Sequence, residues 1–454
     1  MFLLKIRPVI YKPEETFLSD KASKKGYWGF VRSRHDYEKE KNNILKELSS
    51  IIKDLEKEGY NIELMEVIES PPTLESFKFY DKLSEADLVI IFPFGFHHPY
   101  TEAILLTPKY VVFFDKFKPI YSGTLFAPPI VREYEDSGFH DILIVEGDWR
   151  RLRKVIRAVY ALASIKKSKL VIVGPPNKMF GGMKTFRKAI KLFGFKPIFY
   201  TYEDFAKLFS QMWNDEDVLE EAKKIAEEFT KKAENVIETP EEKLLRASVY
   251  YLALKKLVEE NEADWVTVNC LSELINKTGA TPCMAFTLFN DSGIVATCEA
   301  DPTMLPLHYI LSKIAARPSV FIDPTVNEGK GTLILAHCTS PLKVLGYDKP
   351  AIKYNVMTHH ESNTSATVKP VYPEGTITIA GFDFSLSRMI IIKGEVVGSP
   401  SLRICRAQVE VKVKDAHKVL ENWEGFHWVY IYGDYVDELT ILCKILGITA
   451  KIIA

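Results

Sequence analysis

The sequence predicts an α/β fold: two doubly wound, Rossmann-like domains followed by a β-rich C-terminal domain that forms a small antiparallel barrel. Two patterns favour this fold. Apolar runs of strand length alternate with helical stretches early in the chain, whereas beyond Gly329 apolar and polar residues alternate with a period of two. A chain of 454 residues is also too long for a single core. We expect three domains, covering residues 1–165, 166–295 and 296–454.

The N-terminal α/β domain is predicted from a series of apolar runs that read as strands. A long charged stretch, residues 36–59, carries apolar residues at helical spacing between the first two runs. Strands joined by helices form parallel sheets with crossover connections, so we expect one doubly wound sheet here. The expected strands cover residues 2–10, 61–68, 86–94, 109–115 and 141–148.

The second α/β domain is expected to follow a closing helix at 149–169. It opens with a strand and a glycine-rich turn in "LVIVGPPNKMFGG". The turn, residues 174–182, matches neither of the nucleotide-binding patterns GxGxxG and GxxxxGK[ST], so a turn that begins a helix is favoured over a phosphate site. A charged helical stretch, 214–262, then leads to another strand, "DWVTVNCLSEL".

The β-rich C-terminal domain is predicted from segments with strand periodicity that glycine and proline separate. They are "TITIAGFDFS", "RMIIIKGEVVG" and "LRICRAQVEVKV". The last residues, 426–454, return to a strand, a helix and a strand. We expect the antiparallel segments to form a small barrel.

Composition excludes several classes of partner. The chain has 59 basic and 60 acidic residues, so its charge gives no reason to expect nucleic acid as a partner. No apolar run approaches membrane-spanning length, and the apolar start is too short for a signal peptide, so we expect no membrane and a cytoplasmic location. The six cysteines form no CxxC pair, which fits buried thiols better than a zinc ribbon or a disulfide scaffold.

Two carboxylates follow predicted strands, where ligands bind in open α/β sheets. Glu273 follows "WVTVNCLS", and Asp301 follows "IVATCEA". If the two strands are neighbours, these side chains come together. The alternative for Asp301 is a cap on the next helix, because Pro302 follows it. Glu299 projects on the same face as Asp301 if the strand continues, which gives it a supporting role.

Histidines and aromatic residues supply the other candidates. His427 lies among aromatic residues in "ENWEGFHW" and is alone more typical of a hydrogen-bonded core residue. Two carboxylates and one imidazole, however, suit a divalent ion such as Mn²⁺ better than zinc. His337 in "LILAHCTSP" ends a strand and could line a pocket. His359 in "MTHHESNTS" lies in an exposed loop or at a polyol-binding edge. The aromatic segment 92–102 suits either the apolar face of a sugar or plain packing.

Several of these motifs resemble one family. "IRPVI", "FPFGF", the glycine-rich turn, "CEAD" and "NWEGFH" are similar to segments of the L-fucose/L-arabinose isomerase-like ketol isomerases, closest to L-fucose isomerase. The resemblance runs through all three predicted domains. It implies a metal-dependent aldose–ketose isomerase that acts on a free, L-fucose- or L-arabinose-like monosaccharide through a cis-enediol intermediate.

The resemblance also implies a site. Glu273, Asp301 and His427 would bind Mn²⁺ or another divalent cation, and the two carboxylates would also serve as acid and base. The active site would lie at a subunit interface of a homotrimer or homohexamer. The residues implied to contact the sugar are Arg7, Phe92, Asn422, Trp423, His337 and His359.

Two other functions stay open from the sequence. A non-catalytic sugar-binding or regulatory protein could be built on the same fold. Another metal-enolate enzyme, an epimerase or an aldolase, would use a similar set of ligands.

Overall fold

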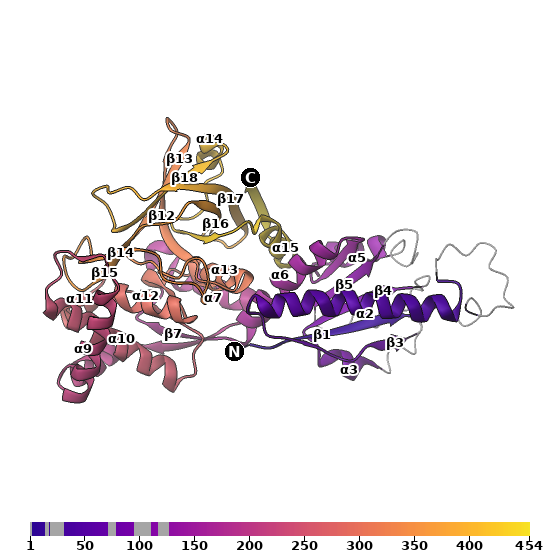
Figure 1. Cartoon of the computed structure of the whole chain (residues 1–454), viewed down its shortest axis with the longest axis horizontal. Coiled ribbons are helices and arrows are strands. Elements are labelled where there is room, and N and C mark those ends of the chain that lie inside the picture. Colours follow the sequence, from indigo (N-terminus) through magenta and orange to yellow (C-terminus); the bar gives the residue numbers. More distant parts are fainter. Residues whose placement is uncertain (1, 14–17, 19–30, 71–78, 95–109, 117–126) are drawn as a thin grey trace. The chain divides into compact units, whose positions relative to one another are not determined.

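The structure is a computed structural model, which describes residues 2–13, 18, 31–70, 79–94, 110–116 and 127–454 (Figure 1). The chain divides into two compact units. The first consists of Met1–Ser164 and Lys444–Gly447, and the second of Ile165–Cys443 and Ile448–Ala454.

The first unit is a parallel sheet in the order β2-β1-β4-β5-β6, with β3 also paired to β1 (Figure 1). Every residue of β4 and β5 is buried, as expected for central strands of a parallel sheet that is covered on both faces. The strands are β1 (Leu4–Tyr11), β2 (Ile62–Leu64), β3 (Ile68–Ser70), β4 (Leu88–Pro93), β5 (Tyr110–Asp115) and β6 (Ile142–Glu146). The helices are α2 (Arg34–Lys57), α3 (Tyr80–Ser84), α5 (Ala127–Asp136) and α6 (Trp149–Lys167), the last of which contains the boundary between the units.

The second unit begins with another parallel sheet, in the order β11-β10-β7-β8. Its strands are β7 (Lys169–Val173), β8 (Lys196–Tyr200), β10 (Trp265–Val268) and β11 (Val295–Thr297). Its helices are α7 (Gly182–Phe193), α8 (Tyr202–Trp213), α9 (Glu216–Lys231), α10 (Glu241–Glu260), α11 (Leu274–Thr278), α12 (Cys283–Ser292) and α13 (Met304–Ala315).

The glycine-rich turn does begin a helix, as its sequence predicts. It contains the short 3₁₀ helix η4 (Lys178–Phe180), which Asn177 caps by accepting a hydrogen bond from the Met179 amide. Gly181 then adopts φ 100° and leads into α7. A side chain at this position would collide with Thr185, since an added Cβ would lie 2.1 Å from its Oγ1.

The C-terminal part of the second unit is a barrel. Six antiparallel strands follow one another in the order β16-β19-β12-β13-β18-β17, and pairing of β16 with β17 closes the ring. β20 (Thr449–Ile453) adds to β17 in parallel. The barrel strands are β12 (Val320–Asn327), β13 (Thr332–His337), β16 (Gly375–Phe382), β17 (Arg388–Gly398), β18 (Ala407–Val413) and β19 (Trp428–Tyr432), with helices α14 (Ala416–Glu421) and α15 (Val436–Leu446).

The predicted fold class is therefore confirmed: two parallel α/β sheets and an antiparallel barrel. The structure adds a small sheet in the order β15-β14-β9, which joins β15 (Thr367–Pro370), β14 (Tyr354–Met357) and β9 (Asn235–Val236). Aliphatic and aromatic side chains such as Ile379, Val409 and Trp428 fill the barrel core.

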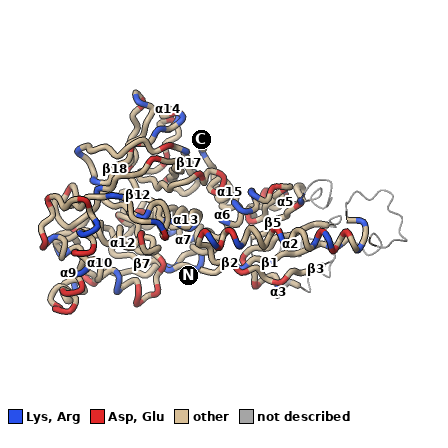
Figure 2. Tube along the Cα trace, viewed as in Figure 1, with Lys and Arg blue, Asp and Glu red and all other residues tan. Residues whose placement is uncertain are grey.

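The surface charges agree with the balanced composition. Figure 2 shows basic and acidic residues interleaved along α2. No helix in the described part of the chain is long and apolar enough to cross a membrane.

Candidate metal centre

One group of side chains in the second unit has the composition and spacing of a cation site. One ligand atom each from Glu299, His337 and His427 lies within 4.8 Å of the other two. Glu299 Oε1 is 3.4 Å from His337 Nε2, and Glu299 Oε2 is 3.8 Å from His427 Nε2. The side chains of both histidines are at most 5% exposed. The carboxylate thus faces two buried imidazoles.

An unusual backbone turn brings Glu299 into this group. β11 ends at Thr297, and the chain continues as the short 3₁₀ turn Cys298–Ala300. Glu299 and Ala300 both have positive φ, 57° and 47°, in the left-handed region that non-glycine residues rarely adopt. The turn is tied to the glycine-rich loop, because the Asn177 amide donates to the Ala300 carbonyl at 3.1 Å. Backbone strain of this kind is concentrated at functional sites.

His427 is oriented by Asp301. Nδ1 of His427 lies 2.8 Å from Oδ2 of Asp301, whose side chain is fully buried. Oδ1 of Asp301 accepts hydrogen bonds from the Thr303 amide and hydroxyl at 2.8 and 2.7 Å, and from the Met304 amide at 3.4 Å. Both oxygens are therefore occupied, and Nε2 of His427 is left to face Glu299.

Asp323 is a further carboxylate beside the group, and the sequence analysis did not select it. Its Oδ1 lies 3.2 Å from His427 Nε2. This oxygen is buried and has no hydrogen-bond partner, although the side chain as a whole is 36% exposed. Burial raises the pKa of Asp323, while the charges of His337 and His427 oppose that rise. A carboxylate in the apolar strand "VFIDPTVN" was the signal that could have revealed it.

The carboxylates of the group favour positive charge on His337. Burial alone would lower the pKa of His337, but its hydrogen bond with Glu299 and the charge of Asp323 raise the pKa to about 9. Burial raises the pKa of Glu299, and the interactions with His337 and His427 outweigh burial and lower it. A site that stabilises positive charge on an imidazole would also favour a cation.

Aromatic rings surround the imidazoles. Phe180, from the glycine-rich turn, packs edge-on against His427 with 4.4 Å between ring centroids. Phe321, from β12, lies 4.6 Å from His427 and 4.8 Å from His337. These rings exclude water and lower the local dielectric, which strengthens electrostatic interactions within the group.

The residues present fit a divalent cation. Two imidazoles and one or two carboxylates are donors that Mn²⁺, Zn²⁺ and similar ions accept. The Nδ1–H of His427 bonded to a buried carboxylate is the arrangement that typically supports a metal-ligating histidine. A buried polar atom without a hydrogen-bond partner is also expected where a ligand completes the site, and Asp323 Oδ1 is of this kind.

The structure does not bring together all three residues expected to bind the metal. One oxygen of Asp301 accepts hydrogen bonds at the start of α13, and the other contacts the imidazole of His427. Asp301 therefore acts as a helix cap, as the alternative expected, and also binds His427. Glu273 is exposed at the start of α11 and lies outside the group, near Tyr202 and Lys277.

Two residues expected to contact the sugar have structural contacts near the barrel. Asn422 ends α14, and its side-chain amide donates to the Lys418 carbonyl at 2.9 Å. Trp423 packs against Trp428 with 4.4 Å between ring centroids.

His359 interacts electrostatically with Glu299. It is 5% exposed, and its Nδ1 is 2.9 Å from the Ser362 hydroxyl. Burial raises the pKa of Glu299. The charge of His359 opposes this rise, less strongly than the interactions with His337 and His427 do.

Arg7 and Phe92 belong to the first unit and are both buried. Arg7 donates to the Glu66 carbonyl at 2.9 Å and pairs with Glu85 at 3.2 Å. Phe92 packs edge-on against Phe114. The rest of the aromatic segment, residues 95–102, lies outside the described residues.

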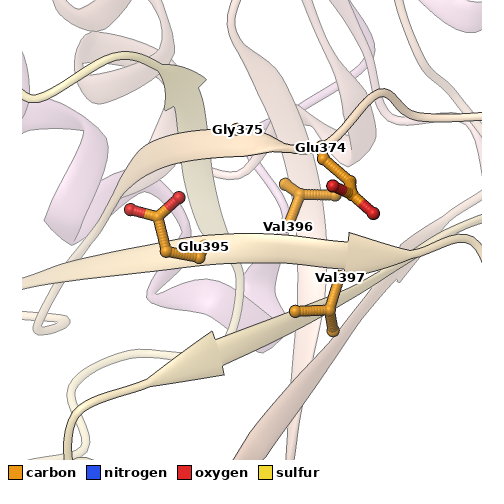
Figure 3. Close-up of a pocket in the computed structure, with 5 residues that line it drawn as sticks. All are labelled: Glu374, Gly375, Glu395, Val396 and Val397. Carbon is orange, nitrogen blue, oxygen red and sulfur yellow. The ribbon is translucent and has the colours of Figure 1, made fainter.

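A separate hollow of about 480 Å³ lies on the barrel (Figure 3). It is lined by the start of β16 and the end of β17, and shares no residue with the Glu299 group. The lining residues are Glu374, Gly375, Glu395, Val396 and Val397. Glu395 accepts a hydrogen bond from the Thr376 hydroxyl at 2.7 Å, so its carboxylate already has a structural partner.

Fold and site together define an α/β protein with a C-terminal barrel and a buried carboxylate–imidazole centre of the kind that binds divalent cations. In sequence, the chain is similar to proteins named sulfoquinovose isomerase. It is 26% identical over 214 residues to the protein of this name from Clostridium sp. (strain MSTE9). The match covers 44% of this chain and 47% of that protein. The chain is 22% identical over 315 residues to the proteins of this name from Priestia aryabhattai and Priestia megaterium (strain ATCC 12872 / QMB1551), and this match covers 66% of this chain and 68% of each relative.

The chain thus spans about half the length of the Clostridium relative in this match. No family model matches the chain. The relatives support the broader expectation of an enzyme that isomerises a sugar, but they do not single out L-fucose isomerase.

Proposed function

We propose that this protein is a metal-dependent aldose–ketose isomerase that acts on a free monosaccharide. The observation that carries the proposal is the group formed by the partly buried Glu299 and the buried His337 and His427, whose ligand atoms lie within 4.8 Å of one another. The similarity to sulfoquinovose isomerases supports the same reaction type. Glu299, His337 and His427 would hold the cation, with Asp323 as the adjacent carboxylate.

The cation is proposed to be Mn²⁺, with other divalent ions as alternatives. When bound, it supplies Lewis-acid stabilisation of the negative charge that develops on the sugar oxygens. Asp301 keeps the Nδ1 proton of His427 in place, so that the Nε2 lone pair is available. Phe180 and Phe321 keep water away from both imidazoles.

Ketol isomerisation moves a proton between C1 and C2 and another between the two oxygens, so the chain must provide groups that accept and return protons. We assign the transfer at carbon to Asp323. Its side chain is 36% exposed and lies beside His427, so the carboxylate can be reached from solvent. The earlier candidates fit less well: Asp301 has both oxygens occupied, and Glu273 lies outside the group.

The substrate is proposed to be sulfoquinovose or a related aldose, since the relatives carry that name. L-fucose and L-arabinose are the alternatives that the motif resemblance gives. A panel of these three sugars, each incubated with the chelator-treated protein and then with added Mn²⁺, tests the proposal. NMR would follow ketose formation and the deuterium incorporated in D₂O at C1 of the ketose, because C2 of the ketose is the carbonyl carbon and carries no hydrogen.

We expect one sugar to give a ketose only when metal is present, and Glu299→Gln to abolish its formation. Binding of sugar without conversion would favour a non-catalytic binding protein. Inversion at one carbon would indicate an epimerase, and cleavage of the carbon chain would indicate an aldolase. Each of these three results would overturn the proposed isomerase.

We further propose a homotrimer or homohexamer, an expectation that comes from the motif resemblance. Size-exclusion chromatography with light scattering tests it directly. A monomer at working concentration would contradict it.

A further inference from the structure

Two cations hold the segment that carries His427. Glu424 lies three residues before His427, between α14 and β19, and is 5% exposed. Its carboxylate accepts two parallel hydrogen bonds from Arg388, 2.8 Å from Nε to Oε1 and 3.2 Å from Nη2 to Oε2. Nζ of Lys451 lies 2.5 Å from the same Oε1. One nearly buried carboxylate is thus bound by two basic side chains.

Strand pairing brings the two cations together. β17 and β20 are parallel neighbours, with Arg388 opposite Thr449 and Ile390 opposite Lys451. Residues two apart on a strand project on the same face, so Arg388 and Lys451 share a face of this strand pair. That face also carries Ile390 and Ile453 of the barrel core. The register of two barrel-wall strands therefore directs both cations to Glu424.

The charge of Glu424 is part of this arrangement. Burial raises the pKa of Glu424, but hydrogen bonds from Arg388 and Lys451 outweigh burial and lower it. Arg388 also lies 3.3 Å from a carboxylate oxygen of Asp383. Paired charges with low exposure are costly to separate, because a partner that remains buried loses its counter-charge. The position of Glu424 is therefore strongly restrained.

The restraint continues from Glu424 to the backbone of His427. The indole N–H of Trp428, which is fully buried, donates to the Glu424 carbonyl at 2.7 Å. The indole N–H of Trp423 donates to the Gly425 carbonyl at 3.0 Å. His427 thus follows a tethered turn and precedes a buried anchor. A shift of Glu424 would be passed on to the imidazole.

We propose that Glu424, held by the two cations, is a positioning residue that fixes the backbone of His427 in the candidate metal centre. Asp301 orients the imidazole ring, whereas Glu424 fixes the point from which the ring projects. The effect on the imidazole depends only on contacts within the chain. The effect on the cation rests on the proposed function of the Glu299 group.

Small displacements matter at this position. Nε2 of His427 lies 3.8 Å from Glu299 and 3.2 Å from Asp323. Binding constellations work when their groups are held within about 0.5 Å of the productive geometry. Glu424→Gln keeps the size of the side chain but sets an amide that can donate beside two cations, which also donate. The turn would move away from them and take His427 with it.

The test uses the full-length protein labelled with [¹⁵N]histidine, studied by NMR without cation and by Mn²⁺ titration calorimetry. Loss of a signal in His427→Asn identifies the His427 resonances. We expect Glu424→Gln to shift these resonances in the cation-free protein and to lower the Mn²⁺ affinity by at least about tenfold. Lys451→Met should act in the same direction with a smaller loss.

Two further variants make the test specific. Arg388→Lys keeps the charge but loses the parallel pair of hydrogen bonds, so it should shift the same resonances even where Glu424→Gln does not fold. Lys393→Met is the matched control on β17. It removes an exposed ion pair with Asp434, 2.8 Å long, and should change neither the His427 resonances nor the Mn²⁺ affinity.

Unchanged His427 resonances in the folded Glu424 and Arg388 variants would overturn the inference, even if the unfolding midpoint fell. Shifted resonances with an unchanged Mn²⁺ affinity would overturn it as well, because the displacement would then not matter to the centre. A wild-type protein that binds no Mn²⁺ would contradict the proposed function alone, since the resonances would still report the position of the imidazole.

Discussion

Nδ1 of His427 and Oδ2 of Asp301 are 2.8 Å apart, and their side chains are 1% and 0% exposed. This pair joins the residue before β19 of the barrel to the start of α13. Because the other oxygen of Asp301 binds the first amides of that helix turn, one carboxylate both begins the helix and fixes the imidazole. The position of the His427 imidazole in the candidate centre therefore depends on this one carboxylate.

Asp301→Asn is expected to weaken Mn²⁺ binding by about 10–100-fold. An amide nitrogen facing Nδ1 would donate rather than accept, which moves the imidazole proton to Nε2 and removes the lone pair offered to the cation. Titration calorimetry measures the affinity, and ¹⁵N NMR identifies the tautomer. Thr303→Val is the control, since it removes a hydroxyl bonded to Asp301 and keeps the contact with His427. Equal losses of affinity in both variants would contradict a positioning role.

Substitutions test whether the cation binds the Glu299 group or the set of ligands that the family resemblance implies. We expect Glu299→Gln and His337→Asn each to lower Mn²⁺ affinity by at least about 100-fold, because each removes a ligand atom from the group. Glu273→Gln should change the affinity by less than about threefold, since Glu273 lies outside the group. Calorimetry on the folded variants, with circular dichroism to verify the fold, decides between the two sets. A large loss for Glu273→Gln alone would restore the earlier assignment.

Gly425 lies two residues before His427 and has φ +68°. A Cβ added here would lie 2.2 Å from the Phe382 carbonyl oxygen, so Gly425→Ala adds a backbone clash to the strain of the left-handed conformation. We expect it to lower the free energy of unfolding by at least about 3 kcal/mol and to weaken Mn²⁺ binding.

Gly331 provides the matched control for this prediction. Its φ is +65°, and an added Cβ would meet nothing within 4 Å, so Gly331→Ala isolates the conformational strain. We expect a loss of about 1 kcal/mol and no change in Mn²⁺ affinity. Urea unfolding measures both variants, and equal destabilisation would refute the argument from the clash.

The burial of His308 predicts that the stability of the protein depends on pH. Its Nε2 donates to the Ser319 carbonyl at 3.0 Å, which leaves Nδ1 to accept from the Thr297 hydroxyl at 3.0 Å. Burial lowers the pKa of His308 to about 4, although the bond to Ser319 opposes this shift. Because the folded-state pKa is lower than the unfolded one, about 6.5, the stabilising contribution is complete above that pH and is lost as pH falls towards 4.

The expected loss attributable to His308 is about 2 kcal/mol between about pH 7.5 and pH 5. Urea unfolding of the wild type and of His308→Gln at both pH values measures it. The variant should be less stable at the higher pH, and the difference between the two proteins should shrink at the lower pH. A difference that does not change with pH would show that the pKa of His308 is the same in the folded and the unfolded protein.

Periodicity predicted the fold class because burial dictates it. Every residue of β4 and β5 is buried and all but Asp115 are apolar, whereas buried and more exposed residues alternate in parts of the barrel strands, as in the second half of β17. The turn at Glu299 could not be predicted in this way. A strand that continued would place Glu299 on the face of Asp301, but two successive left-handed residues end that alternation. No local sequence pattern specifies such a turn, since it is held by contacts with a distant loop.

The rest of the candidate site depends on long-range pairing. His427 and Asp301 were expected together, and they touch, but the role of Asp301 follows only from the bonds to both of its oxygens. His337 was recognised at a strand end, without any indication of the residue that it would face. Asp323 sits beside His427 because β12 pairs with β19, and sequence alone does not give that register.

The four side chains at the candidate centre come from the 3₁₀ turn Cys298–Ala300, β12, β13 and the residue before β19. Folding therefore has to complete both the α/β sheet and most of the barrel before the donors converge. Only the fully folded chain would then bind the cation, and the bound cation would lower the population of partly folded chains. At a free cation concentration 100-fold above the dissociation constant, mass action alone would add about 2.7 kcal/mol to the apparent stability. Chelation should correspondingly lower the unfolding midpoint even when no sugar is present.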